Sequence, residues 1–362
     1  MANTKLFGNG MIFPITALLI LLVLTAGCNS LGVGKKTPIS TIPEIYTGID
    51  GIDVGFSPES VPKSISAGSA TNVVLLVANK GAVATPATPS TIITVKDTRG
   101  AFTLLSAKGT DKFDFSNQLI TGKGAFGGKE SSPAATGDLE GIVLSIKAKD
   151  FLKNEKGEIV ENSINTGLLA TVCYDYGTKL TANVCVDAAP YSFQKQRKPC
   201  DYTVPLVYTK GQGAPVAITR VETLDPDKSE SYVKPRFKIF IANVGTGIII
   251  NKDKLNLFCA APDSSKDGSK PATDNTPRIN IVHIEKVKLN DKDLKCSYNN
   301  KDGVPNEVLS GIASKDYILC NYDGTDYLDG SGTFATPLTV ELSYGYTFTS
   351  NPIPVTVEKG VS

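Results

Sequence analysis

The clearest structural signal in the sequence is a strict alternation of apolar and polar residues near its C-terminal end. Every second position from residue 338 to residue 348 is apolar, namely Leu338, Val340, Leu342, Tyr344, Tyr346 and Phe348. Because successive side chains of a β-strand point to opposite faces, this spacing places all six on one face of an extended strand. Residues 142–148 and 237–241 alternate in the same way. The pattern predicts strands that each bury one face.

This strand belongs to an internal repeat. Residues 76–81 (LVANKG) match residues 240–245 (FIANVG) at an offset of 164, and the alternating positions of 168–176 match those of 338–346 at an offset of 170. Two agreements at nearly the same offset indicate a duplicated module. Each copy is expected to contain a strand that ends in Asn-x-Gly, where both residues tolerate turn conformations. Each copy then finishes with an aromatic strand, a polar turn (176–181 in the first copy) and a return strand.

Many short strands separated by turn signals predict an all-β fold of two tandem antiparallel β-sandwich domains of the immunoglobulin-like type. A Gly-rich segment lies between the two copies and is expected to be the linker. The predicted division is a signal peptide (1–27), a lipidated cysteine with a flexible tether (28–50), a first sandwich (51–208), the linker (209–215) and a second sandwich (216–359).

The N-terminus has the features of an export signal. Lys5 precedes an apolar run from Met11 to Leu24, and small residues follow. A basic region, an apolar stretch and small residues before a cut site are typical of a secretory signal peptide. The sequence LTAGC, which ends at Cys28, resembles the lipobox of lipoprotein signal peptides, with Thr25 where an aliphatic residue is typical. That resemblance implies lipid on Cys28. The alternative is an uncleaved membrane helix over residues 11–27, at the short edge of the roughly 17 to 25 residues that span a bilayer.

The remaining six cysteines are disulfide candidates: Cys173, Cys185, Cys200, Cys259, Cys296 and Cys320. None forms a C-x-x-C, and with a single histidine in the chain no ordinary zinc set can be assembled. Disulfides require an oxidising compartment, which agrees with export.

Spacing leaves the pairing open. Cys185 can pair with Cys173 across the predicted polar turn, or equally with Cys200. Cys296 and Cys320 bracket a Gly- and Asn-rich segment and form the better pair in the second copy. The odd cysteine of each copy can pair across the linker, pair with a partner protein, or remain a thiol.

The strand exits also carry a resemblance. The run 73–81, and its second version that ends in Asn243-Val244-Gly245, resemble the strand-and-turn signature of CARDB-type and related immunoglobulin-like modules of prokaryotic surface proteins. Residues 211–219 resemble inter-domain joints of archaeal surface proteins. The resemblance implies extracellular display, adhesion or spacing, and it carries no catalytic residues with it.

Composition argues against several functions. The chain has 37 basic and 36 acidic residues, one histidine and no tryptophan. A net charge near zero removes the electrostatic reason to expect nucleic acid as a partner. His283 lies in a strand-like run, and no G-x-S-x-G elbow accompanies it. A structural or surface-facing histidine is therefore expected, and the chain is predicted not to be an enzyme.

Two other patterns invite a binding function. Asp323, Asp326 and Asp329 lie three residues apart in a Gly-containing loop, which could supply part of a calcium site. The spacing is not that of an EF-hand, and Asp with Gly is ordinary turn chemistry. An aromatic sugar-binding face can be imagined from the paired tyrosines at 174, 176, 344 and 346. Their period of two favours core packing instead.

The sequence thus predicts a membrane-anchored protein of the cell surface, with two modules that serve as a stalk, adhesion unit or structural unit. No cofactor is expected beyond the weak calcium candidate. The expected partners are the membrane and a surface protein or polysaccharide. Two alternatives stay open: a subunit of a surface filament or layer, and an exported metal-dependent hydrolase or calcium- or carbohydrate-binding protein, with His283 near the aspartate loop.

Overall fold

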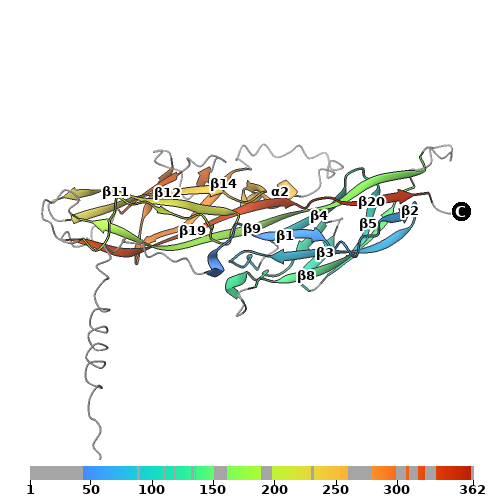
Figure 1. Ribbon diagram of the computed structural model, residues 1–362, viewed down its shortest axis with the longest axis horizontal. Helices are drawn as coiled ribbons and strands as arrows, with labels where there is room; N and C mark the ends of the chain where they lie inside the picture. Colours follow the sequence, from blue (N-terminus) through green and yellow to red (C-terminus); the bar gives the residue numbers. More distant parts are fainter. Residues whose placement is uncertain are drawn as a thin grey trace, which may run out of the picture. The chain divides into compact units, whose positions relative to one another are not determined.

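The computed structural model describes residues 44–359, except 88–89, 110, 117–118, 132–133, 135, 151–160, 189–197, 230–231, 260–278, 299–306, 310–316 and 323–331. The predicted signal peptide, Cys28 and most of the tether lie outside the described residues. Strands form nearly all of the regular structure (Figure 1), which confirms the all-β class. The helical elements are short: η1 (Glu44–Tyr46), η2 (Lys129–Ser131), η3 (Lys252–Lys254) and α2 (Leu255–Cys259). No helix among the described residues is long and apolar enough to cross a membrane.

The strands form three sheets. A four-stranded sheet has the order β1 (Ile52–Phe56), β3 (Ala70–Asn79), β8 (Leu139–Ala148) and β5 (Phe102–Lys108). A five-stranded sheet has the order β10 (Leu206–Val207), β11 (Val216–Ser229), β12 (Tyr232–Asn243), β18 (Tyr317–Asn321) and β16 (Lys295–Tyr298).

The third sheet has 11 strands, and its main path is β15 (Lys292–Asp293), β14 (Ile281–Leu289), β19 (Thr333–Thr349), β9 (Ser163–Asp187), β4 (Thr91–Asp97), β7 (Leu119–Gly122) and β6 (Phe113–Ser116). Four strands join this path from the side: β13 (Ile248–Ile250) on β19, β17 (Glu307–Leu309) on β14, β20 (Ile353–Glu358) on β9, and β2 (Ser64–Ser66) on β20.

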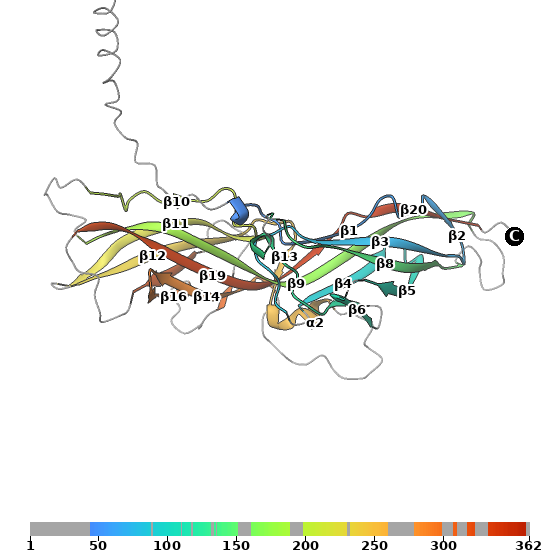
Figure 2. The same cartoon turned by 90° about the horizontal axis from the view of Figure 1, so that it is seen from below.

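The third sheet is organised around one long antiparallel pair. All 17 residues of β19 pair with β9, from Thr333 opposite Asp187 to Thr349 opposite Thr171. Both views show the two strands side by side (Figures 1 and 2). The next strand, β20, continues along β9, with Ile353 opposite Leu168. Strands from the two sequence copies therefore share one continuous ladder.

The predicted turn at residues 176–181 is wrong, because β9 runs without a break through this segment. The polar residues there are satisfied inside the sheet. Thr178 is buried, its backbone pairs with β19, and its hydroxyl donates a hydrogen bond to the carbonyl of Val216 at 2.5 Å. The predicted return strand of the second copy is also wrong, since β20 pairs with β9 and not with β19. A polar stretch marks a turn only when the sheet offers it no partners.

Four tyrosines lie close together in the long pair, towards its Thr171–Thr349 end. Tyr176 is opposite Tyr344, and Tyr174 is opposite Tyr346. The offset of 170 that relates the copies converts Tyr174 into Tyr344 and Tyr176 into Tyr346, so the register has a local two-fold relation. All four side chains are at most 2% exposed. The prediction of core packing over a sugar-binding face is confirmed.

Hydrogen bonds repeat the same two-fold relation. At the end of β3, Asn79 accepts a hydrogen bond from the hydroxyl of Tyr176 at 2.9 Å. At the end of β12, Asn243 accepts one from Tyr346 at 3.1 Å. Both strands end where they were predicted to. However, Gly81 and Gly245, two residues after these asparagines, are not among the glycines with a positive φ. A Cβ added at Gly81 would collide with the Tyr176 hydroxyl. The glycine in Asn-x-Gly therefore makes room for a tyrosine and does not serve a left-handed turn.

The segment predicted as a linker, residues 209–215, is largely buried from Gly211 onward. The carbonyl of Gly213 accepts a hydrogen bond from Ala82 N–H, and its N–H donates to Gly48. Gln212 bonds both the N–H and the carbonyl of Ile218. The described residues group into one compact unit. The two predicted sandwich segments, 51–208 and 216–359, therefore share a sheet, and the segment between them is part of the packed structure.

Three disulfides connect the six cysteines. Cys185–Cys200 and Cys296–Cys320 form as two of the considered pairs, whereas Cys173 does not pair with Cys185. The two odd cysteines bond to each other, Cys173 on β9 with Cys259 on α2. This third disulfide joins the two sequence copies, which confirms the alternative in which the odd cysteines pair across the linker. Disulfides persist in oxidising compartments, so these bonds are compatible with an extracellular β-rich protein.

Candidate binding pocket beside the paired strands

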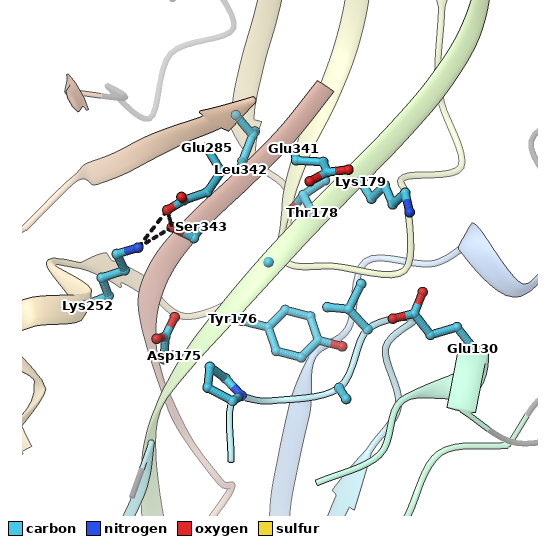
Figure 3. A pocket seen from close by; sticks show the side chains of 14 residues that line it. Glu130, Asp175, Tyr176, Thr178, Lys179, Lys252, Glu285, Glu341, Leu342 and Ser343 are labelled. Carbon is cyan, nitrogen blue, oxygen red and sulfur yellow. Dashed lines mark hydrogen bonds and ion pairs between the residues drawn. The ribbon is translucent and has the colours of Figure 1, made fainter. Parts of the chain in front are cut away.

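A polar pocket of about 420 Å³ lies beside the centre of the β9–β19 pair (Figure 3). Its wall comes from both long strands, from residues 83–86, and from side chains of η2, η3 and β14. The pocket therefore forms where β9 of the first sequence copy pairs with β19 of the second. Six charged side chains line it, namely Glu130, Asp175, Lys179, Lys252, Glu285 and Glu341, together with the hydroxyl-bearing residues Tyr176, Thr178 and Ser343.

Lys252 is the centre of a hydrogen-bonded cluster. Its Nζ lies 2.7 Å from Glu285 Oε1 and 2.7 Å from Ser343 Oγ. The Ser343 hydroxyl also donates to the Glu285 carboxylate. These hydrogen bonds, the one from Lys252 first, hold the pKa of Glu285 below its usual value. The Lys252 ammonium, the Glu285 carboxylate and the Ser343 hydroxyl are thus hydrogen-bonded to one another.

Local structure explains how three distant segments meet. Asn251 caps η3 by accepting a hydrogen bond from Asp253 N–H at 3.0 Å, which fixes the turn that carries Lys252. A register shift in β14 between Ile284 and Lys286 leaves Glu285 without a partner in the ladder. Such β-bulges redirect a side chain, and here the bulged residue reaches Lys252.

Asp175 is a half-buried carboxyl between the two core tyrosines of β9. Burial raises its pKa to about 6, and the nearby carboxylates of Asp253 and Glu285 add to the rise. The ammonium of Lys252 opposes the shift. A carboxyl with this pKa changes its charge in the mildly acidic range, so the net charge of the pocket depends on pH there.

The hydrogen bonds of Ser343 and Lys252 can be compared with those of a catalytic serine–lysine pair. A serine–lysine pair can catalyse acyl transfer when the lysine takes the hydroxyl proton. In this pocket Lys252 donates to both Ser343 and Glu285, and the Ser343 hydroxyl donates to the same carboxylate. The arrangement is an ion pair extended by a hydroxyl.

Apart from the disulfide cysteines, the residues singled out from the sequence lie either near the pocket or outside the described residues. His283 lies on β14 with 12% of its side chain exposed, and its Nε2 is 3.9 Å from Asp253 Oδ2. It stands near the pocket but does not line it. The aspartates at 323, 326 and 329 lie outside the described residues, as does Cys28. Within the described residues, no group of three or more His, Cys, Asp or Glu side chains is arranged to hold a metal ion.

Sequence reasoning did not find the pocket residues. Lys252, Glu285 and Ser343 come from three elements and form no motif along the chain. The one available signal is Asp175, a charged residue flanked by Tyr174 and Tyr176 in a strand whose alternate side chains are buried.

Comparison with known proteins assigns no family. No protein-family model and no curated protein matches the chain. Among solved structures, the C-terminal domain of the Streptococcus pyogenes antigen I/II-family protein AspA is 10% identical with a TM-score of 0.19, over 86% of this chain and 100% of that chain. The C-terminal domain of the Streptococcus agalactiae antigen I/II polypeptide BspA is 9% identical with a TM-score of 0.15, over 83% and 95%. AvmM, which catalyses macrocyclization in alchivemycin A biosynthesis, is 16% identical with a TM-score of 0.20, over 38% and 80%. Scores this low carry no argument, and the resemblance to CARDB-type modules stays a prediction.

Proposed function

We propose that the chain is a membrane-anchored surface protein whose β unit acts as a braced spacer or adhesion unit without catalytic activity. The observation that carries the proposal is the β9–β19 ladder, which joins strands of both sequence copies over 17 residues. The disulfide between Cys173 and Cys259 connects the copies covalently as well. If residues 209–215 acted as a hinge between the copies, the β9–β19 pairing and the Cys173–Cys259 disulfide would have to break.

The chemistry of the described side chains supports the same role. The tyrosines are buried, and the pocket cluster is closed on itself by hydrogen bonds. Three disulfides suit a protein that works in an oxidising exterior, where chaperones and reductants of the cytosol are not available. The anchor belongs to the proposal through Cys28 and the apolar run before it.

Cell fractionation with intact-mass analysis tests the location. We expect the protein in the membrane fraction, sensitive to protease added outside intact cells, with Cys28 as a lipid-bearing first residue and no free thiol. An unprocessed Met1 together with seven free thiols in the cytosolic fraction would refute the proposal.

A pair of variants tests the absence of catalysis. Lys252→Met dismantles the polar cluster, and His283→Ala removes the only histidine. If the protein is a spacer or adhesion unit, both variants keep normal surface display and normal attachment of cells. Loss of attachment at normal display and unchanged thermal midpoint would show that the pocket takes part in the function, and a product formed by the wild type but not by Lys252→Met would refute the absence of catalysis.

A further inference from the structure

The four-stranded sheet has an apolar outer face. Three large side chains on it are open to solvent: Leu76 on β3 is 37% exposed, and Leu139 and Val143 on β8 are 65% and 41% exposed. The register brings them together with Val74, which lies opposite Val143, and with Ala78, which lies opposite Leu139. We call these five residues the apolar face.

The sequence of β3 is that of a strand covered on both sides. Residues 73–78 read VVLLVA, without a polar position. A continuous apolar run of this length is typical of a strand that is buried on both faces, whereas a strand with one solvated face alternates. In the single chain, only every second residue of this run is fully buried. The fold of one chain therefore leaves half of the run without the cover that its composition indicates.

The second sequence copy treats the equivalent positions differently. The offset of 164 relates Val74 to Lys238 and Leu76 to Phe240. Phe240 is only 8% exposed, and the Arg220 guanidinium carbon lies 4.0 Å from the centre of its ring. Long side chains with charged ends shield apolar surface in this way while the charge stays in water. Because the second copy covers this surface with its own side chains, the bare surface is a specific feature of the first copy.

Two glycines create notches on either side of Leu76. In the ladder, Leu76 lies between Gly55 on β1 and Gly141 on β8. A Cβ added at Gly55 would have no heavy atom within 4 Å, and one added at Gly141 would meet only the Val74 side chain, at 3.8 Å. Both positions therefore have room for a side chain that the sequence leaves out. Glycine inside a strand often marks a site where another backbone approaches closely.

The pattern of large and small residues is complementary to itself. The sheet order β1-β3-β8-β5 has its midline between β3 and β8. A two-fold axis along this midline would lay β3 of one copy over β8 of a second copy, with matching rows in contact. Leu76 then faces Gly141 of the second copy, and Leu139 faces Ala78. Val74 faces Val143. Large side chains opposite small ones allow two layers to interdigitate.

We propose that two copies of the chain dock through the apolar face, related by this two-fold axis. Since β3 has 10 residues, the outer face of the sheet measures about 33 Å along the strands and about 19 Å across them. Covering it on both copies buries about 1,200 Å², which is at the lower end of the range for specific protein–protein interfaces. Asp53, Lys108 and Lys147 lie around the apolar face, as in the polar rim of such interfaces. A sugar or nucleic acid fits less well, because the five apolar side chains offer it no hydrogen bonds.

Crosslinking of the full chain in intact cells tests the proposal. The six cysteines of the β unit are bonded in pairs, so Val74→Cys adds a thiol on the apolar face. Facing sheets pack about 10 Å apart, so a membrane-permeable bis-maleimide of about that reach should link two copies. We expect a band at twice the mass of the monomer on a denaturing gel. The controls are the wild type and Lys238→Cys, the equivalent position of the second copy, and both should give only a background of this band.

A second pair of variants tests the apolar contact itself. Added to Val74→Cys, Leu139→Lys would bury an unpaired ammonium between the two sheets and should lower the yield of the dimer by about tenfold or more. Val207→Lys is the matched control, because Val207 is 61% exposed but lies on β10 of the five-stranded sheet. It should leave the yield unchanged. Both residues are at the surface, so unfolding midpoints equal to that of Val74→Cys alone should confirm that each variant is folded.

Three results would overturn the proposal. The first is the absence of an adduct of Val74→Cys, and the second is an equal yield from Val74→Cys and Lys238→Cys. The third is an adduct of another mass, which would mean that a different protein covers the apolar face. Because the crosslinker crosses membranes, the experiment does not depend on where the protein is located. A dimer in the cytosolic fraction would support the docking and refute the surface location, whereas a displayed monomer would do the reverse.

Discussion

Replacing Gly81 by alanine should disrupt the junction of the two sequence copies. The new Cβ would collide with the Tyr176 hydroxyl and lie 2.6 Å from the Gly213 carbonyl oxygen and 2.7 Å from that of Asp50. Two of these obstacles are backbone atoms, so rotation of a side chain cannot relieve the contact. Overpacking of this kind costs about 1 to 3 kcal/mol. Displacing Tyr176 also breaks its hydrogen bond to Asn79, which adds about 1 to 3 kcal/mol at a buried site.

Chemical denaturation of the oxidised protein measures the effect. We expect Gly81→Ala to lower the free energy of unfolding by about 2 to 5 kcal/mol, with a clear shift of the denaturant midpoint. Gly55→Ala is the matched control, because a Cβ at Gly55 has no heavy atom within 4 Å. Alanine there should be neutral or stabilise the fold by about 0.4 to 1 kcal/mol. If the two variants have equal midpoints, the tight packing of Tyr176 against Gly81 is not what makes glycine necessary.

Four further perturbations probe the same region. Removing the disulfide by the pair Cys173→Ala and Cys259→Ala should cost about 4 to 5 kcal/mol in denaturant unfolding, because it closes a loop of 86 residues. Tyr346→Phe leaves a backbone N–H without its acceptor and should lower the thermal midpoint, corresponding to about 1 to 3 kcal/mol. Asp175 has a folded pKa of about 6, above its unfolded value, so wild-type stability should rise as pH falls through about 6, and Asp175→Asn should abolish that dependence in unfolding curves from pH 8 to 5. Lys252→Met should raise the pKa of Asp175 further, because the ammonium lowers it, as an NMR titration of the carboxyl group would show.

Strands with alternating apolar residues were predictable from the chain alone. The run at 338–348 lies in β19, the run at 142–148 lies in β8, and the run at 237–241 lies in β12. In each case the predicted apolar face is buried at most positions. The prediction works because a period of two is a local property, which each strand carries in its own sequence.

The polar details were less predictable because they depend on contacts between distant segments. The turn expected at 176–181 is an interior part of β9, since β19 supplies partners for its backbone. The cluster of Lys252, Glu285 and Ser343 has no signature because each residue belongs to a different element. Asn-x-Gly was recognised at the right places, yet the reason for its glycine became visible only beside Tyr176.

By itself the sequence determined the all-β class, the duplication, the buried faces of the main strands, and the number of cysteines left over in each copy. Tertiary structure decided how the copies combine: they share a sheet, bury the segment at 209–215 and join their odd cysteines as Cys173–Cys259. The physical reason is the range of the interactions. Alternation and turn residues act over a few positions, whereas strand partners and disulfides are chosen among groups far apart in the chain, which only the packed core brings together.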